Sequence, residues 1–185
     1  FYAAHEALLL EYEDAMIRVD SRSGRLYDTS AHLLWVGERT RGPQDAHVTL
    51  LTGVHNPVGV KIGPDTAPDD VVALIGALRD RFPGGELIFD ATDRAGLAYG
   101  NRYVRRTGNT CAPMRFHVDD PAALARACGV ELVEQRPFFT RARALLGRRL
   151  GLRTRIAMAV ADRLRRTMIV HLAFGPGAPE GRRLP

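Results

Sequence analysis

The sequence predicts an α/β fold, on the strength of three observations. Its centre alternates between element types, with a β-branched strand pattern at residues 58–62, a helix pattern at 68–78 and a second strand pattern at 86–90. With 45% hydrophobic and 25% charged residues, its composition is globular, which excludes a disordered or collagen-like chain. A length of 185 residues is enough for one domain with a buried core, or for two small domains.

Short elements are expected in the first third of the chain. Residues 6–18 mix apolar and acidic side chains, which fits either a strand or a short helix. A turn rich in Ser, Asp and Gly follows at residues 20–24. Residues 32–36 are typical of a buried strand, and residues 46–52 of a helix or a strand.

The central helix has recognisable boundaries. Gly63 and Pro64 close the strand before it, and either Asp65 or Thr66 is expected to cap its first turn, near Pro68. Its apolar side chains recur at helical spacing and predict one buried face: Val71, Val72, Leu74, Ile75 and Leu78.

The alternation continues in the second half of the chain. Residues 114–118 and 130–133 have strand patterns. Between them, Asp120 and Pro121 open a helix that stops at Gly129.

The last segments are an Arg-rich stretch, a strand and a tail. Residues 141–166 are amphipathic and are interrupted at Gly147 and Gly151. Residues 168–174 are expected to form the closing strand. Residues 175–185, rich in Gly, Pro and Arg, are expected to form a frayed tail.

Charge is distributed unevenly along the chain. The formal net charge of +5 divides into −5 for residues 1–70 and +10 for residues 71–185. Such asymmetry fits two domains, an interaction tail or two joined pieces. The basic residues are 25 Arg and one Lys, Lys61, a ratio that a GC-rich coding sequence explains. The net charge is therefore weak evidence for a nucleic-acid partner.

Neither a membrane nor a nucleic acid is expected as a partner. No apolar run approaches the roughly 18–20 residues of a membrane span. Residues 141–166 could form a basic helix on nucleic acid or a membrane, but a solvated face in an Arg-biased chain is the favoured interpretation. Cys111 and Cys128 are too few for a disulfide framework or a zinc site, which favours a cytoplasmic location.

The richest chemistry follows two predicted strands. Glu38 and Arg39 come directly after the strand at 32–36, and ligand groups collect at the carboxyl ends of parallel strands. Lys61 lies in a β-branched strand between Gly59 and Gly63. An Arg fork and a Lys point charge suit phosphate or carboxylate, so an anion site at the mouth of a barrel is predicted. An ordinary edge-strand lysine is the alternative for Lys61.

Four motifs closely resemble the class II, or plant-type, 3-deoxy-arabino-heptulosonate 7-phosphate (DAHP) synthases. They are HEALLLEY at residues 5–12, TSAHLLWVGERTR at 29–41, DAHV at 45–48 and HNPVGVKIGP at 55–64. The resemblance covers about residues 1–72 and implies part of a (β/α)8 barrel. It also implies the condensation of phosphoenolpyruvate with erythrose 4-phosphate, the first step of the shikimate pathway of aromatic amino-acid biosynthesis, with a divalent metal, Mn or Co.

The resemblance also implies roles for individual residues. Glu6 matches the acidic residue that positions an active-site water. Glu38, Arg39 and Lys61 match phosphoenolpyruvate-binding positions, and Trp35 and Gly37 match pocket-lining positions. Core packing is the alternative for Trp35. The family's metal ligands, a Cys and later His, Glu and Asp residues, have no counterpart here, and its barrel needs more than twice this length. A complete synthase site is therefore not expected in this chain.

A second set of motifs is similar to another family. Residues 68–90, 104–108, 114–121 and 130–138 resemble the C-terminal half of S-adenosylmethionine-dependent O-methyltransferases of the leucine carboxyl and tetracenomycin type. This resemblance implies the late strands of a Rossmann-like sheet, closed by an antiparallel hairpin near residues 168–174. The glycine-rich loop that takes S-adenosylmethionine is absent, so no site for this cofactor is assigned.

The expected organisation is therefore a synthase-like segment at 1–67, a methyltransferase-like segment at 68–174 and the tail, with a join within 66–78. The leading hypothesis is a fragment of a class II DAHP synthase, inactive by itself. The alternatives are a methyltransferase remnant and a non-enzymatic basic binding segment. Unpaired strand edges and exposed apolar faces would favour a homo-oligomer.

Overall fold

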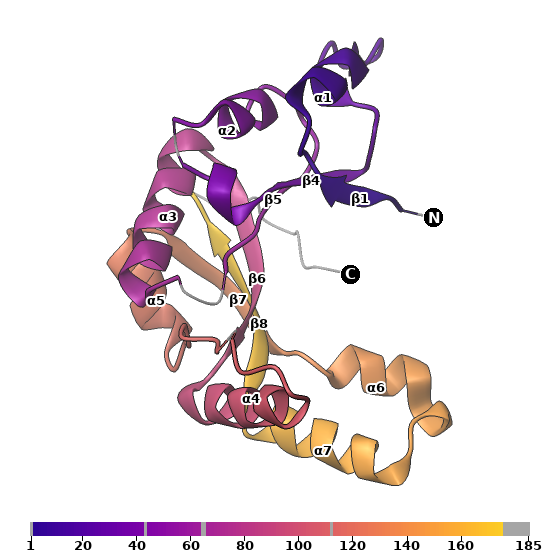
Figure 1. The fold of residues 1–185 in the computed structure, drawn as a ribbon, viewed down its shortest axis with the longest axis vertical. Coiled ribbons are helices and arrows are strands. Elements are labelled where there is room, and N and C mark those ends of the chain that lie inside the picture. The colour runs from indigo at the N-terminus through magenta and orange to yellow at the C-terminus, as the bar shows by residue number, and fades with distance from the viewer. Residues whose placement is uncertain (1, 43, 64–65, 112, 176–185) are drawn as a thin grey trace. The chain divides into compact units, whose positions relative to one another are not determined.

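A computed structural model describes residues 2–42, 44–63, 66–111 and 113–175 (Figure 1). The chain forms two compact units, Phe1–Gly63 (unit 1) and Pro64–Pro185 (unit 2). The sequence placed a domain boundary at 67/68, and the origin of the two segments in different families stays a prediction. Residues 176–185 of the expected frayed tail lie outside the described residues. None of the helices in the described ranges is both long and apolar enough to cross a membrane.

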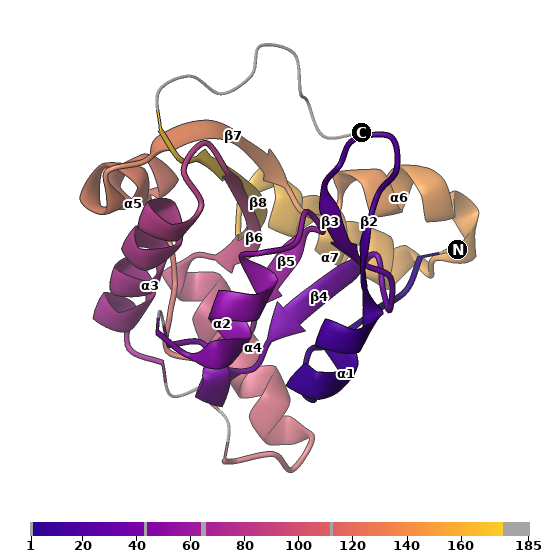
Figure 2. The same ribbon diagram turned by 90° about the horizontal axis from the view of Figure 1, so that it is seen from above.

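Unit 1 is built on a parallel three-stranded sheet in the order β1-β4-β5 (Figure 2). These strands are β1 (Ala4–Glu6), β4 (Leu33–Val36) and β5 (Val58–Val60). Along β4 the buried residues alternate: Leu34 and Val36 lie in the core, whereas Leu33 is exposed and Trp35 is half-buried. The expected strand at 32–36 is therefore present with one face in the core.

The other elements of unit 1 are short. Residues 6–18, for which a strand or a helix was expected, contain the last residue of β1, then α1 (Leu10–Met16), then the start of β2 (Ile17–Val19). Strand β2 pairs antiparallel with β3 (Leu26–Asp28). Residues 46–52 are resolved in favour of a helix, α2 (Ala46–Leu51).

The turn predicted at residues 20–24 is closed by one carboxylate. Asp20 accepts hydrogen bonds from the Ser23 hydroxyl at 2.5 Å and from the backbone N–H of Ser23 at 3.0 Å. These bonds, with one from the N–H of Arg22, lower the pKa of Asp20. Gly24, at φ 69°, supplies the left-handed residue that returns the chain to β3.

A buried polar network joins the elements of unit 1. Glu13 is 2% exposed; its carboxylate lies 2.9 Å from His5 Nε2 and accepts a 2.8 Å bond from the Ser30 hydroxyl. The N–H of Ser30 donates to buried Asp28, and the Asn56 side chain accepts from the Asp28 N–H and donates to its carbonyl. Buried polar groups are costly without such partners, so the network fixes the positions of β1, α1 and β3.

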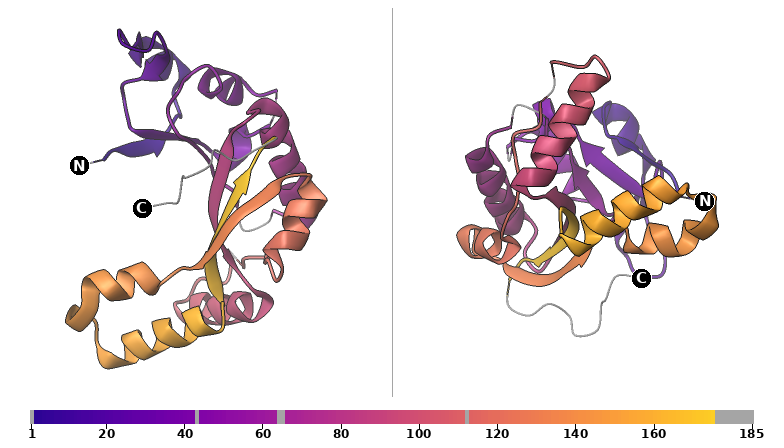
Figure 3. Two further views of the ribbon diagram at one scale, coloured as in Figure 1. Left: turned by 180° about the vertical axis from the view of Figure 1, so that it is seen from behind. Right: turned by 90° about the horizontal axis from the view of Figure 1, so that it is seen from below.

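Unit 2 contains an antiparallel sheet in the order β6-β8-β7 (Figure 3). These strands are β6 (Glu86–Thr92), β7 (Glu131–Pro137) and β8 (Thr167–Ala173). Strand β8 lies between the other two, and its Val170 and Leu172 are fully buried. The chain is therefore mixed α/β, as expected, whereas the partial (β/α)8-barrel segment and the late strands of a Rossmann-like methyltransferase sheet stay predictions.

Helices pack against this sheet and extend from its strands. Residues Val71 and Ile75 of α3 and Ala125 and Cys128 of α5 enter the same core cluster as β8. Buried Asp162 of α7 accepts bonds from the start of α6 and so joins these two helices. The helices are α3 (Pro68–Arg81), α4 (Arg94–Arg106), α5 (Pro121–Cys128), α6 (Thr140–Leu146) and α7 (Leu152–Arg163).

Helix α7 leaves an apolar stripe on its surface. Leu152, Ile156 and Val160 are exposed and recur every four residues, and Leu164, just past the helix, continues the series. The amphipathic pattern of residues 141–166 therefore does not place these side chains in the core. The interruptions expected at Gly147 and Gly151 are present, because a short 3-10 helix (Gly147–Arg149) and an extended residue separate α6 from α7.

Two local expectations were wrong, and one helix was not expected. Residues 114–118 are not a strand, because the Asn101 side chain of α4 binds both the N–H and the carbonyl of Met114 in place of a neighbouring strand. Helix α3 begins after Ala67, whose N–H donates to Asp70, and not after Thr66; Asp65 lies outside the described residues. Helix α4 was not expected at all.

The end of α5 depends on a close approach between two chain segments. Gly129 has φ 64°, in the left-handed region, and a guanidinium N–H of Arg79 in α3 donates to the Cys128 carbonyl at 2.8 Å. This bond satisfies one of the carbonyls left unpaired at the helix terminus. Burial raises the pKa of the Cys128 thiol, and the nearby Arg79 charge opposes that effect.

We expect Gly129→Ala to lower the free energy of unfolding by about 1–2 kcal/mol, because a side chain at positive φ is strained. Its Cβ would also lie 2.7 Å from a guanidinium nitrogen of Arg79. Urea denaturation measures the change. The matched control is Gly76→Ala in α3, where nothing lies within 4 Å of an added Cβ and where alanine should be neutral or stabilising. Equal effects of the two substitutions would contradict this account of α5.

Candidate functional site

The carboxyl ends of β1, β4 and β5 lie side by side. The N–H of Ala7 donates to the Trp35 carbonyl at 2.9 Å, and the N–H of Lys61 donates to the Val36 carbonyl at 3.0 Å. The pairing therefore continues to the last residue of each strand. It brings Glu6, the turn that begins at Gly37 and Lys61 to one edge of the sheet, although 55 positions separate the first from the last.

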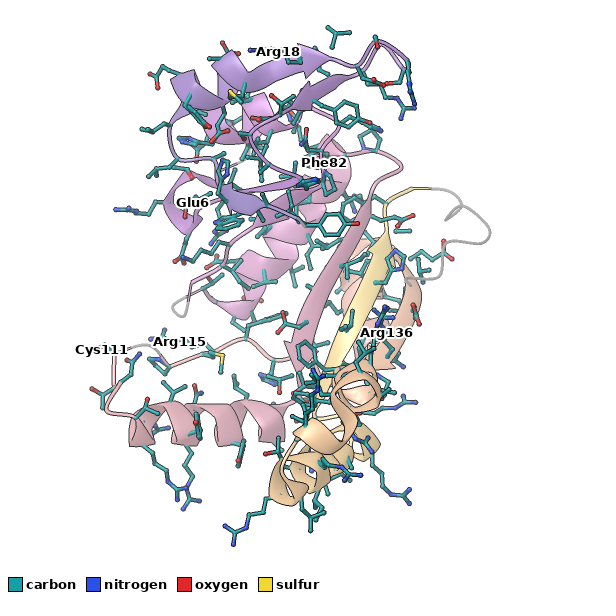
Figure 4. All side chains as sticks on the ribbon, turned by 90° about the vertical axis from the view of Figure 1, so that its right-hand side faces the viewer. Glu6, Arg18, Phe82, Cys111, Arg115 and Arg136 are labelled. Carbon is teal, nitrogen blue, oxygen red and sulfur yellow. The ribbon has the colours of Figure 1, made fainter. Side chains whose placement is uncertain are left out.

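Gly37 provides room for the Glu6 carboxylate. Its φ of −71° and ψ of 164° suit any residue, so conformation does not require glycine here. Glycine is required because of the available space, since a Cβ on Gly37 would overlap Oε1 of Glu6 (Figure 4 labels Glu6). A second carboxylate is placed in the same way, since a Cβ on Gly63 would overlap the carboxylate of Glu38.

Trp35 lies on the non-core face of β4. It is opposite Glu6 of β1 and Gly59 of β5 in the sheet register. A Cβ on Gly59 would be 3.0 Å from the Trp35 Cβ, so this glycine allows the tryptophan to lie close to β5. Trp35 does not belong to the buried cluster that contains Leu34 and Val36, which argues against a role in the core of unit 1.

The edge also carries cationic side chains. Arg39 follows Glu38 in a single 3-10 turn (Glu38–Thr40), and both Arg39 and Lys61 are exposed. Within the described residues, neither forms an ion pair. Arg41, which the sequence interpretation did not assign to the site, has its Nε shielded from solvent and without a hydrogen-bond partner in the described chain. A buried donor of this kind favours an acceptor such as an anion oxygen.

The histidines of unit 1 are engaged elsewhere. Each contacts another part of this unit: His5 contacts Glu13, His32 accepts from the N–H of Ala3, His47 contacts the Leu8 carbonyl and His55 contacts Arg25. In the described ranges, no group of three or more His, Cys, Asp or Glu residues could hold a metal ion. The described residues therefore do not fit a bound metal.

A parallel α/β sheet whose carboxyl edge gathers carboxylates and cations is typical of enzymes that bind phosphorylated or carboxylated ligands. The sequence model of the class-II DAHP synthetase family matches residues 1–97, which is more than half of the chain. The chain therefore belongs to this family.

Individual relatives agree with the family match. The chain is similar to the phospho-2-dehydro-3-deoxyheptonate aldolase of Streptomyces coelicolor, at 46% identity over 89 residues, 48% of this chain and 20% of that protein. The corresponding aldolase of Mycolicibacterium smegmatis is 44% identical over 91 residues, 46% of this chain and 20% of that protein. A probable chloroplastic aldolase of this type from Catharanthus roseus is 40% identical over 150 residues, 75% of this chain and 30% of that protein.

These comparisons bear on the extent of the synthase-like segment. The chain spans between a fifth and three-tenths of the length of these relatives. The family match continues through residues 66–78, where the sequence suggested a join. The Catharanthus match covers 75% of the chain, which is more residues than the family match covers, so it extends past residue 97. None of these comparisons supports a methyltransferase portion.

We expect Gly37→Ala to lower the free energy of unfolding by about 1–3 kcal/mol, because its Cβ needs the space of the Glu6 carboxylate. Glu6→Ala removes that carboxylate, so the double variant should recover part of the loss. A double-mutant cycle in urea measures this coupling, expected to be at least about 0.5 kcal/mol. Purely additive effects would show that the two residues do not compete for space.

Proposed function

We propose that the carboxyl edge of β1-β4-β5 is the phosphoenolpyruvate-binding part of a class II DAHP synthase site. The observation that carries the proposal is the parallel pairing that brings Glu6, the Gly37–Arg39 turn and Lys61 together. Strands β1, β4 and β5 are neighbours in this order, as consecutive strands of a (β/α)8 barrel are. We therefore interpret unit 1 as a segment of such a barrel.

The cations would hold the two acidic groups of phosphoenolpyruvate. Arg39 can donate two parallel hydrogen bonds to a phosphate or carboxylate, and Lys61 adds a point charge. Both are exposed, and neither is neutralised by an ion pair within the described residues. The donor at Arg41 Nε could take a further oxygen. Together these groups would offset the negative charge of the ligand.

The remaining residues would shape the site around the reacting carbon. Glu6 would position a water molecule, and the space that Gly37 leaves sets where its carboxylate lies. Trp35 would line the pocket on the same face, and Glu38 lies against Gly63 next to the phosphate-binding lysine. Condensation with erythrose 4-phosphate, and the Mn or Co ion implied by the family, are proposed for the whole synthase site, to which this chain contributes one part.

Two further features belong to the proposal. The free thiols of Cys111 and Cys128 support a reducing compartment such as the cytoplasm. The exposed stripe of α7 and the outer edges of the two three-stranded sheets support self-association into a homo-oligomer.

We expect Lys61→Ala and Arg39→Ala each to weaken phosphoenolpyruvate binding by about tenfold, because each removes a charged hydrogen-bond donor. Trp35, the single tryptophan of the chain, reports binding through its fluorescence. Arg22→Ala is the matched control, since Arg22 is an exposed arginine of unit 1 in the turn between β2 and β3. Unchanged binding in both site variants, or an equal loss in the control, would refute the proposal.

A second proposal concerns residues 68–174. The sheet order β6-β8-β7, with β8 antiparallel to both neighbours, supports the resemblance to the closing strands of a methyltransferase sheet. The early strands that carry the cofactor loop would then have to come from another chain. Calorimetry with S-adenosylmethionine should therefore give heat only when the N-terminal half of such a methyltransferase is added. Absence of heat in the mixture, or heat from this chain alone, would overturn this second proposal.

A further inference from the structure

Helix α4 presents an arginine-rich face. Its half-buried apolar residues, Leu97 and Val104, lie on the inner side, and no residue of the helix is buried. At 100° per residue, the arginines share one sector of the helix surface, which begins beside this inner side and extends to the opposite side. They are Arg94, Arg102, Arg105 and Arg106. Figure 4 shows long side chains extending from α4 on the side away from the segment that holds Arg115.

Three of these arginines have no neutralising partner among the residues that the structure describes. Arg94 lies 3.8 Å from a carboxylate oxygen of Asp119. Arg102, Arg105 and Arg106 form no ion pair with any residue in the described ranges, and α4 contains no acidic residue. Like charges three and four positions apart on a helix repel each other. This repulsion is relieved when an anion binds between them.

The same arginines line a shallow hollow that is open to solvent. Its volume is about 470 Å³, and it is lined by Ala98 together with Arg102, Arg105 and Arg106. Ala98 and the three arginines, which follow it by four, seven and eight positions, are all exposed on α4. The hollow is wide enough for a phosphate-bearing ligand, and guanidinium groups match phosphate oxygens with paired hydrogen bonds.

Two tyrosines lie beside the arginines on the solvent side. Tyr99 is 73% exposed and Tyr103 is 62% exposed, one helical turn apart. Exposed aromatic rings next to arginines are typical of surfaces that stack nucleic-acid bases while cations hold the phosphates. Net charge gave only weak evidence for such a partner, whereas this local arrangement is specific.

We propose that the hollow on α4, formed by Ala98, Arg102, Arg105 and Arg106, binds phosphate groups. The phosphate is supplied either by a free diphosphate or by the backbone of a single-stranded nucleic acid whose bases stack on Tyr99 and Tyr103. The site belongs to unit 2 alone and is independent of the sheet edge in unit 1.

The test uses the full chain and two probes, inorganic diphosphate in calorimetry and a fluorescent oligothymidylate of about ten nucleotides in anisotropy. The site variant combines Arg102→Ala, Arg105→Ala and Arg106→Ala. The matched control combines Arg149→Ala, Arg153→Ala and Arg163→Ala, which removes the same charge from exposed arginines of the same unit. We expect the site variant to bind whichever probe the parent chain binds about 100-fold more weakly than the parent. The control variant should lose less than about threefold in affinity.

Further variants identify the source of the phosphate. Tyr99→Ala with Tyr103→Ala should weaken oligothymidylate binding about tenfold and leave diphosphate unchanged if a nucleic acid is the ligand. Binding of diphosphate without the oligonucleotide would assign a free phosphate. Replacing the three site arginines by lysine keeps the charge and the fold but removes the paired geometry, and should weaken binding about tenfold. The proposal is overturned if neither probe binds, if the control loses as much affinity, or if the lysine variant binds as well as the parent.

Discussion

The parallel pairing of β4 with both β1 and β5 is the constraint on which the candidate site depends. Parallel strands end at the same edge, so three stretches of sequence that are far apart deliver their next residues to one place. The register is equally important. A slip of one residue would turn Trp35 into the core and Leu34 out of it, and the buried face of β4 makes that slip costly.

The position of β1 depends in turn on a buried carboxylate. Glu13 contacts His5, the neighbour of Glu6, and also accepts the Ser30 hydroxyl bond. A carboxylate that is 2% exposed is tolerated only with such partners, so the network specifies one arrangement of β1 against α1. Glu6, for which a chemical role is proposed, therefore directly follows His5, which the buried network holds in place.

Much of the fold was predictable because its signals are local. Apolar spacing identified β4, α3 and α5, and Asp120 caps α5 as expected. The motifs led to six predicted site residues, whose roles stay predictions. Helix α4 was not predicted because its two glycines and few large apolar residues weaken the helix signal, although its apolar and arginine side chains lie on different sides. Residues 114–118 have a strand pattern, but the Asn101 side chain takes the Met114 hydrogen bonds that a neighbouring strand would take. Arg41 could be singled out only once its buried Nε was visible. The methyltransferase resemblance has no support from the relatives compared.

The central place of β8 has a consequence for how unit 2 is made. Strands β6 and β7 pair with β8 and not with each other, yet β8 is the last of the three along the chain. During synthesis, the backbone groups of β6 and β7 that pair with β8 therefore stay unpaired until residue 173 has left the ribosome. Such late, long-range closure is slow, and it exposes nascent chains to association before the sheet is complete.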